Sequence, residues 1–452
     1  MRSFLAALAK RIQVALALLA VVISCPAFSE SEVRLDPTFA GDGVAKIAFG
    51  PGKSWATTGV TQPDGKIIVA GSVYYKGYFE AMALARTNPN GTPDNGFGDN
   101  GVVVTKVGVN SRSTAVGLMP DGRIVVAGWA HVEKGKEGIT LAVYNVDGTL
   151  DSRFGDRGLL IFPVEYSAAY VYSLTLLADG KIVVGGKITI RKEYRDQPFV
   201  QSVPDDYVLL ARLNGNGSFD ASFGRNGVVV TDVGGGDVRI TGLALQQDGK
   251  LIAAGTRQKN PNSTLVLARY NVNGSLDRNF GVEGLANRTM EKGRYSPPTI
   301  STLPDGRIFL VGGYSLQDDS WLLLSRLHVD GSPDLAFGET GTITTKTKFW
   351  RYSDFIPVTR PDGRILISGM SVRPAKLRQS QPPFYYSVGI ARFLPNGDVD
   401  SSFGRDGMHV VSIGAVTDRP AYMTAQDNGR IIIVGHSDNE VTQQVVVIGL
   451  VP

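Results

Sequence analysis

The sequence has 452 residues, of which 43% are apolar, and its formal net charge is +4. This apolar share supports a packed core and excludes a disordered chain. Three of the four net charges come from Arg2, Lys10 and Arg11, so the rest of the chain is close to neutral. A near-neutral surface argues against a nucleic-acid-binding protein, because that affinity rests on many contacts of Lys and Arg with phosphates.

The N-terminus has the pattern of a signal peptide. Its basic residues precede Ile12–Ser24, an uncharged and mostly apolar segment that is too short to span a bilayer comfortably. Small residues at Ala27 and Ser29 suit a signal peptidase site. We therefore expect a signal peptide at residues 1–29 and export of residues 30–452 to the periplasm or the extracellular space.

Cys25, the only cysteine, offers an alternative. Together with the three residues before it, it resembles a lipobox, in which Cys25 would be lipidated and would anchor the protein to a membrane. Pro26 makes this less favourable. With cleavage after Ser29 the mature chain has no cysteine and therefore no disulfide.

Two motifs alternate seven times along the rest of the chain. The first, Asp-x-x-Phe-(Gly/Ala)-x-x-Gly, occurs at Asp36–Gly43, Asp94–Gly101, Asp151–Gly158, Asp220–Gly227, Asp277–Gly284, Asp334–Gly341 and Asp400–Gly407. The second, Asp/Asn-Gly-(Lys/Arg) followed by an apolar run, starts at Asp64, Asp121, Asp179, Asp248, Asp305, Asp362 and Asn428. Such regular alternation indicates a repeat protein with a period of roughly 57 residues.

Each copy has the pattern of four short strands. In the second copy these are Ser113–Met119, Arg123–Gly128, Thr140–Val146 and Gly158–Phe162. The Asp-Gly pair is a strong hairpin signal, and the Phe-Gly corner predicts another tight turn. Because a four-stranded sheet cannot bury both faces alone, the copies should stack around an axis. The sequence thus predicts an all-β, seven-bladed β-propeller with four antiparallel strands per blade; a β-helix, with far shorter coils, is the alternative.

The two ends of the repeat array are complementary. Arg34–Ala48 matches the fourth strand of a blade, whereas Gln444–Val451 matches a third strand. We expect the N-terminal strand to pair with the C-terminal blade, which would close the ring and remove an exposed edge.

These motifs resemble the delta-60 repeat, a bacterial β-propeller family with no established biochemical function, and the blades are similar to NHL-type blades. The resemblance covers essentially all of residues 31–452. It implies a propeller and an exported location, and it brings no catalytic residues.

A candidate site follows from the residues about nine positions before each Asp-Gly or Asn-Gly turn. An arginine or a large aromatic residue lies at the start of every expected inner strand, at the mouth of a central channel: Trp55, Arg112, Tyr170, Arg239, Arg294, Tyr295, Arg351, Tyr352 and Arg419. Arginine binds carboxylates and phosphates, and aromatic rings stack on sugars. The alternative is structural: these residues pair with local acids and pack at the junctions between blades.

Loops between the second and third strands form a second candidate region. The first, third and sixth copies are rich in aromatic or basic residues there or carry extensions, and the residues that we single out are Tyr75, Tyr78, Arg373, Arg378 and Tyr385. A rigid scaffold would present these loops together on one face. A tolerated insertion with no function is the alternative.

Catalytic and metal-binding patterns are weak. Asn145–Asp151 superficially resembles a calcium loop but lacks the carboxylates of one, so we expect its Asp and Asn side chains to bond the turn backbone, with no cofactor and calcium as the alternative. The four histidines show no metal-ligand spacing. His436 follows the glycine that ends an expected strand, and we expect it on a solvated loop.

Together these observations favour an exported, non-enzymatic binding or scaffold propeller. Its ligand would be an anionic or glycan-like polymer, or a partner protein, bound on the face with the long loops. We expect a monomer that binds no nucleic acid and contacts a membrane only if Cys25 is lipidated. The alternatives are an exported propeller enzyme, a lyase or hydrolase with its site at the central channel, and a purely structural surface protein.

Overall fold

The structure is a computed structural model that describes twelve stretches of the chain: residues 33–75, 79–133, 136–163, 168–191, 204–290, 294–316, 319–346, 355–374, 384–413, 417–426, 428–439 and 442–451. The expected signal peptide and Cys25 lie outside these residues. Within them, no helix is long and apolar enough to cross a membrane.

The described residues form an all-β protein without a helix, and its strands pair in antiparallel fashion except at one residue pair, Tyr386 and Thr417, in the last sheet. The first sheet contains β3 (Lys53–Thr61), β4 (Ile67–Tyr75), β5 (Phe79–Thr87) and β6 (Val102–Thr105). The second contains β7 (Asn110–Leu118), β8 (Ile124–Glu133), β9 (Lys136–Tyr144) and β10 (Leu159–Pro163). The third contains β11 (Ala168–Leu176), β12 (Ile182–Arg191), β13 (Pro204–Leu213) and β14 (Val228–Thr231).

The remaining strands continue this pattern. The fourth sheet contains β15 (Asp237–Leu245), β16 (Leu251–Lys259), β17 (Asn262–Tyr270) and β18 (Arg288–Met290). The fifth contains β19 (Arg294–Tyr295), β20 (Thr299–Thr302), β21 (Ile308–Leu316), β22 (Asp319–Leu327) and β23 (Thr342–Lys346). The last contains β24 (Ile356–Thr359), β25 (Ile365–Pro374), β26 (Phe384–Phe393), β27 (Met408–Val411), β28 (Thr417–Ala425), β29 (Ile431–Asp438), β30 (Gln443–Val451), β1 (Arg34–Leu35) and β2 (Val44–Ile47).

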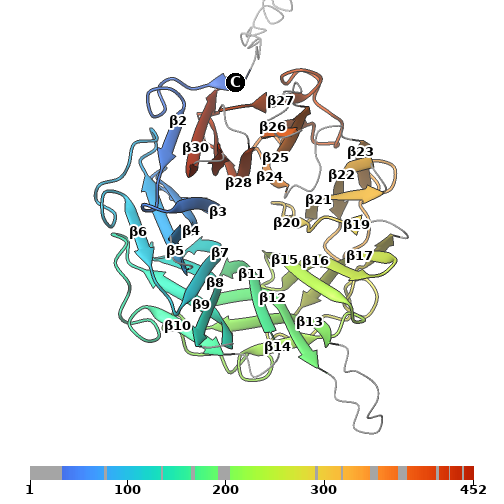
Figure 1. Ribbon diagram of the computed structural model, residues 1–452. Coiled ribbons are helices and arrows are strands. Elements are labelled where there is room, and N and C mark those ends of the chain that lie inside the picture. Colours follow the sequence, from blue (N-terminus) through green and yellow to red (C-terminus); the bar gives the residue numbers. More distant parts are fainter. Residues whose placement is uncertain are drawn as a thin grey trace, which may run out of the picture.

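The sheets stand around a common centre, with β3, β7, β11, β15, β20, β24 and β28 innermost (Figure 1). Successive inner strands contact one another: β3 contacts β7, β7 contacts β11, β11 contacts β15, β15 contacts β20, and β24 contacts β28. β28 in turn contacts β3. Four of the sheets contain four antiparallel strands each, and these blade-like sheets confirm the predicted propeller repeat.

The hairpin turns are those that the Asp-Gly pairs predict. Gly65 and Gly122 have φ values of 81° and 85°, which glycine adopts without the steric cost that a side chain would bring. The turns fix the register of the strands on either side, for example Thr61 opposite Ile67 in β3 and β4.

Both ends of the repeat array lie in one sheet. β2 pairs with β30 in antiparallel fashion, with Val44 opposite Ile448, and β1 also pairs with β30. The backbone N–H of Asp36 donates to the carbonyl of Gly449 at 2.9 Å. The last strand of the chain is therefore covered on its outer side by the first strands.

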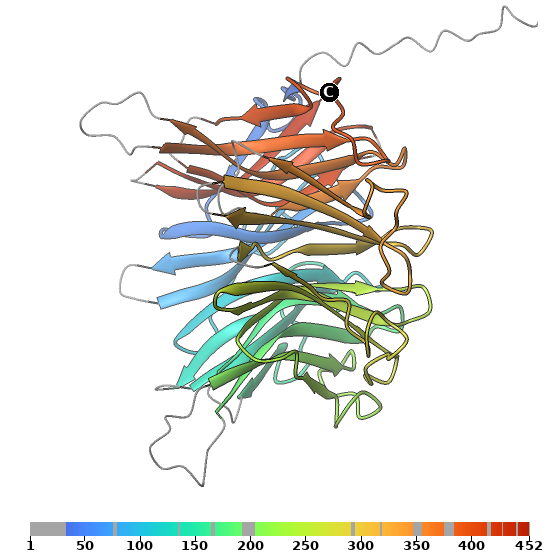
Figure 2. The same ribbon diagram turned by 90° about the vertical axis from the view of Figure 1, so that its right-hand side faces the viewer.

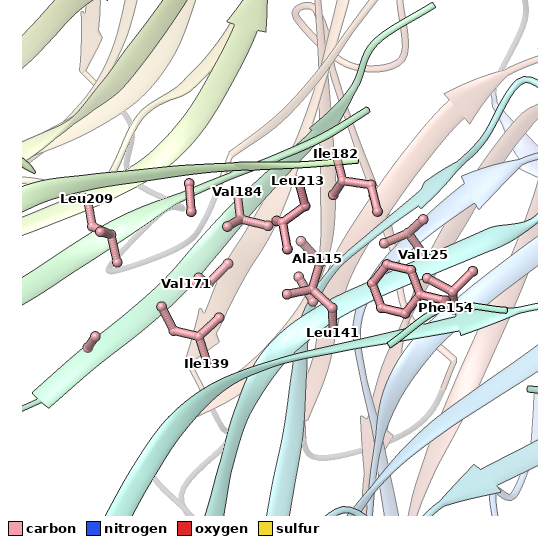
Figure 3. Close-up of a cluster of buried hydrophobic side chains, with 14 of the residues drawn as sticks. Ala115, Val125, Ile139, Leu141, Phe154, Val171, Ile182, Val184, Leu209 and Leu213 are labelled. Atoms are coloured by element: carbon pink, nitrogen blue, oxygen red, sulfur yellow. The ribbon is translucent and has the colours of Figure 1, made fainter. Parts of the chain in front are cut away.

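Apolar side chains fill the space between neighbouring sheets. Figure 3 shows one such cluster, in which Leu141 and Phe154 of one copy meet Val184 and Leu213 of the next. Phe154, the Phe of the first motif, is fully buried. Each sheet thus covers its neighbour, which is why the copies need one another.

A repeated ion pair links the two motifs. The basic residue of the second motif contacts the Asp of the first, and we call these contacts the corner ion pairs. They are Lys66–Asp94 at 3.0 Å, Arg123–Asp151 at 2.8 Å, Lys181–Asp220 at 3.7 Å, Lys250–Asp277 at 3.0 Å, Arg307–Asp334 at 2.7 Å, Arg364–Asp400 at 3.3 Å and Arg430–Asp36 at 2.6 Å.

Five copies add a buried arginine from the third strand, which reaches the same Asp and lies over the Phe of the same motif: Arg86, Arg212, Arg269, Arg326 and Arg392. In four of them a guanidinium nitrogen also donates to a carbonyl of the following copy, on Val146, Val272, Val329 and Pro395 respectively. These four arginines therefore link their own sheets to the following ones. Their ion pairs and hydrogen bonds offset the cost of burying a charge.

Candidate ligand-binding face

The antiparallel topology gives this arrangement of sheets two different faces, seen edge-on in Figure 2. The start of each inner strand lies beside the end of the second strand, as Lys53 lies opposite Tyr74. We call this side the entrance face. The Asp-Gly turns and Phe-Gly corners lie at the other ends of the strands, and we call that side the turn face.

Five predicted site residues occupy equivalent places on the entrance face. Each is the third residue of its nine-residue inner strand: Trp55, Arg112, Tyr170, Arg239 and Arg419. In each strand the register shifts directly after the next residue, as it does between Ala56 and Thr58. Such a bulge bends the strand and re-aims the side chains beside it. Tyr295 is different, because it is only 8% exposed and belongs to the core.

The other predicted residues are less well placed. Arg294, Arg373 and Tyr385 belong to β19, β25 and β26, but their side chains are outside the described part of the structure. Tyr78, Arg351, Tyr352 and Arg378 lie outside the described residues altogether.

Arg112 is the centre of the best-defined cluster. Its guanidinium carbon lies 5.3 Å from the ring centre of Trp55 and 5.9 Å from that of Trp129. Its Nε and Nη2 atoms donate to the two carboxylate oxygens of Glu80 at 2.8 and 3.0 Å. Glu80 therefore already occupies the Nε and Nη2 donors of the Arg112 guanidinium, although the Arg112 side chain is 42% exposed.

The sequence did not single out Trp129 or Glu80. Trp129 directly follows Gly128, the glycine of the second strand, and it lies opposite Arg112 in the sheet. Glu80 is the second residue of β5 in the preceding sheet. Pairing with a local acid fits the structural alternative for Arg112 better than a free anion site does.

A second cluster joins the next two inner strands. Tyr170 and Tyr172 stack with ring centres 6.3 Å apart, and the guanidinium of Arg239 lies 5.3 Å from the ring centre of Tyr172. Burial, together with a hydrogen bond to Glu137, raises the pKa of Tyr170 to about 12. The Tyr170 hydroxyl therefore stays protonated at neutral pH. The Arg239 side chain, which completes this cluster, is exposed.

Tyr172 stands where other inner strands carry a threonine that links neighbouring sheets. Thr114 donates to the carbonyl of Val171 at 2.8 Å, and Thr241 donates to that of Pro298 at 2.9 Å. Tyr172 makes its link through the ring beneath Arg239 instead. Tyr172 thus places a large aromatic side chain at a position where Thr114 and Thr241 only link neighbouring sheets.

Further aromatic side chains lie at the ends of the hairpins on the same face. Tyr75 and Phe79 stack at 4.8 Å, and Lys106 lies over the Phe79 ring. Tyr314 and Trp321 stack at 4.7 Å at the end of another hairpin. Tyr75, a predicted loop residue, is thus the last residue of strand β4.

His436 lies in strand β29 and not on a solvated loop, so that expectation was wrong. It stands opposite Arg419 in the sheet. Burial, with the nearby positive charge of Arg419, lowers the pKa of His436 to about 4. Its Nδ1 atom is buried without a hydrogen-bond partner in the described structure, whereas Arg419 is exposed.

The repeated Asp residues bond the backbone of their own turns, as expected. Asp147 accepts from the N–H and the hydroxyl of Thr149 at 3.0 and 2.7 Å. Among the residues that the structure describes, no group of three or more His, Cys, Asp or Glu side chains is arranged to hold a metal ion.

The fold and the repeated corners define the class of the protein: a β-propeller of four-stranded repeats. A family model described as a β-propeller domain of unknown function (DUF5122) matches residues 62–97, 120–154, 207–223, 246–280, 303–337 and 384–403. The matches recur from copy to copy and support a propeller repeat family of unknown function; the delta-60 name stays a prediction.

Solved structures are similar over most of the chain at low sequence identity. A protein of unknown function from Dyadobacter fermentans is 14% identical with a TM-score of 0.43, and the match covers 93% of this chain and 99% of that one. The polysaccharide lyase Uly1 is 9% identical with a TM-score of 0.39, covering 90% and 98%. Drosophila Semaphorin 1b, extracellular domains 1–2, is 7% identical with a TM-score of 0.40, covering 89% and 86%. No curated protein matches the chain.

Proposed function

We propose that the seven motif copies form seven blades of one closed ring. Seven corner ion pairs support this, since the pair between Arg430 and Asp36 joins the two ends of the array in the way that the other pairs join residues within it. The pairing of β2 with β30 and the contact of β28 with β3 support it further. A closed ring would hold the entrance-face side chains in fixed relative positions.

We propose further that the entrance face binds a glycan-like polymer without acting on it chemically. The observation that carries this proposal is the group of Trp55, Arg112 and Trp129, in which two partly exposed indole rings flank one guanidinium. Indole faces stack on the C–H faces of sugar rings, and the polar edge formed by Arg112 and Glu80 would hydrogen-bond sugar hydroxyls.

The pairing of Arg112 with Glu80 favours a sugar over a simple anion at this cluster. An incoming carboxylate would have to displace a bidentate partner that is only 9% exposed. Arg239 and Arg419 are exposed, and they would contact acidic groups elsewhere on the same polymer. A glycan with some acidic sugars therefore fits the face better than an inorganic polyanion.

A glycan array followed by affinity electrophoresis with the best glycans tests the proposal. Trp55→Ala and Trp129→Ala should each weaken binding by about tenfold or more, because a stacked ring contact is lost. Leu335→Ala, at an exposed position on the turn face, is the control and should bind as the parent does. Parent-like binding by both tryptophan variants would refute this site.

The exposed arginines give a second, separable test. Arg239→Ala and Arg419→Ala should weaken binding of acidic glycans by a factor of about two to five and leave neutral glycans unaffected. Arg157→Ala, an exposed arginine at a corner of the turn face, is the matched control. Equal losses for acidic and neutral glycans would contradict the assigned role.

A further inference from the structure

A pocket of about 680 Å³ lies between the fourth and fifth sheets, near the turn face and away from the entrance face. Figure 1 shows β17 and β22, which contribute to it, in adjacent sheets. Five leucines are among its lining residues: Leu265 and Leu267 from β17, Leu310 from β21, Leu327 from β22, and Leu285 just before β18. Its volume is within the range of ordinary small-molecule sites.

The pocket exists because this junction departs from the repeat. Two residues after the last Gly of the first motif, four other copies carry Val103, Leu160, Val229 and Ile343. Val103 and Val229 pack against the Asn/Asp-Gly turn of the next copy, beside Gly148 and Gly274. The fourth sheet has Ala286 there, and no branched side chain fills the gap. Ala45, the other alanine at this position, is only 7% exposed, whereas Ala286 stays partly exposed in the pocket.

A second departure enlarges the space from the other side. Tyr144 and Tyr270 end the third strands of two copies, and their hydroxyls donate to Thr105 and Thr231 of the preceding sheet at 2.7 and 2.9 Å. At the fifth sheet the residue at this position is Leu327, which lacks the ring and hydroxyl. Leu213 of the third sheet lacks them too, but there Phe162 of the preceding sheet packs into the same cluster. An aromatic ring that closes two other junctions is therefore missing here.

The mouth of the pocket is also unusual. Val282 lines it and is 79% exposed. In the same corner position five other copies carry a charged residue: Asp99, Asp156, Arg225, Glu339 and Arg405. An exposed valine at this place extends the apolar lining out to solvent.

One cationic side chain, that of Arg288, also lines the pocket. Arg288 stands where three other copies have Thr105, Thr231 and Thr345, and its guanidinium donates to the hydroxyl of Thr342 at 3.0 Å. No carboxylate in the described part of the chain lies within ion-pair distance of Arg288, so its charge is available to a ligand. Asp330 is the one acid among the described residues that line the pocket, and its carboxylate accepts from the Ser332 hydroxyl at 2.6 Å.

We propose that this pocket binds the aliphatic chain of a medium-chain fatty acid, whose carboxylate pairs with Arg288. The leucines, Ala286 and Val282 supply an apolar wall from the interior to the mouth, which suits a long hydrocarbon chain. The guanidinium supplies the complementary charge for a terminal anion. The inference is independent of the glycan proposal, because the two sites lie on different parts of the molecule.

Titration calorimetry of the whole protein with dodecanoate, kept below its micellar concentration, tests this. We expect one site per chain, and no binding of butyrate, whose chain is too short to fill the pocket. Ala286→Leu, which restores the side chain of Leu160, should weaken dodecanoate binding by about tenfold or more while raising the melting temperature. The raised melting temperature shows that this variant is folded.

Two further variants test the role of the charge. Arg288→Gln should weaken dodecanoate binding by about fivefold and leave 1-dodecanol unaffected. Arg278→Gln, at an exposed arginine outside the pocket, is the control. The proposal is overturned if dodecanoate does not bind, if Ala286→Leu binds it as the parent does, or if Arg288→Gln weakens dodecanol and dodecanoate equally.

Discussion

Arg430 and Asp36 lie 394 residues apart and form a corner ion pair at 2.6 Å. The equivalent Arg123 and Asp151 are 28 residues apart, at 2.8 Å. Arg430 also reaches the carbonyl of Pro89 at 3.3 Å, as Arg123 reaches that of Gly215. The contacts of an internal corner are thus repeated between the two ends of the array.

This equivalence predicts that Arg430→Ala loosens the N-terminal strands. The variant should lose about 2–3 kcal/mol of unfolding free energy, because it leaves the buried Asp36 carboxylate without its cation. Hydrogen exchange should quicken in residues 34–47. Arg123→Ala is the matched control and should quicken exchange only around its own corner; unchanged protection of residues 34–47 in Arg430→Ala would contradict ring closure.

The corner carboxylates predict loss of stability in acid. Burial raises the pKa of Asp220 and Asp334, but hydrogen bonds from Ser222 and Arg307 and nearby guanidinium charges outweigh it and lower both pKa values to about 2. A depressed pKa stabilises the fold above the unfolded-state value near 4, and this contribution disappears as the pH falls towards 2. Urea midpoints at pH 5, 4, 3 and 2 should therefore fall steeply below pH 4.

His436 predicts a separate pH dependence at higher pH. Its pKa is lowered to about 4, chiefly by burial, so the unfolded chain binds a proton between about pH 6.5 and pH 4 that the folded chain does not. Stability should decrease as the pH falls through this window. In His436→Gln the decrease should be smaller, as judged from denaturant midpoints at pH 7, 6, 5 and 4. An identical slope in parent and variant would contradict this.

The first motif contains a strained alanine. Ala40 has a φ of 51° where the other copies have glycine, for example Gly98 and Gly155 with φ of 54° and 52°. Because a side chain in this left-handed region costs about 1 kcal/mol, Ala40→Gly should stabilise the protein by about that amount. Ala421→Gly, in strand β28, is the control and should destabilise it. Thermal unfolding of both variants gives the comparison.

Glu80 predicts a gain in anion binding. In Glu80→Gln the carboxylate is gone and the fork of Arg112 becomes available, so retention on a dextran sulfate column should rise and should fall with added salt. The double variant Glu80→Gln/Arg112→Gln should return to parent retention. If the single variant elutes like the parent, the pairing with Glu80 is not what keeps Arg112 from binding anions.

Much of the fold could be predicted from local patterns. The Asp-Gly turns and Phe-Gly corners specify backbone conformations on their own, so strands such as β7 and β8 lie within a few residues of the predicted ranges. The complementary ends, Arg34–Ala48 and Gln444–Val451, could be matched in the same way, and β2 pairs with β30.

The site was less predictable because it depends on contacts between copies. The pattern placed Arg112 at the start of an inner strand, but its partner Glu80 comes from the preceding sheet, and nothing in the local sequence links the two. Tyr295 fits the same pattern, yet it is buried because Tyr314 packs against it. His436 was misplaced because β29 continues past Gly435, which the motif had suggested as its end.

The pairing of β2 with β30 has a consequence for the order of assembly. Ribosomes make Val44 some four hundred residues before its partner Ile448, so the first strands must wait until synthesis is almost complete. During that interval the N-terminal strands and the last completed sheet each expose an edge whose backbone N–H and C=O groups are unpaired. A chain truncated shortly before Gln443 should therefore aggregate far more than the full-length protein does.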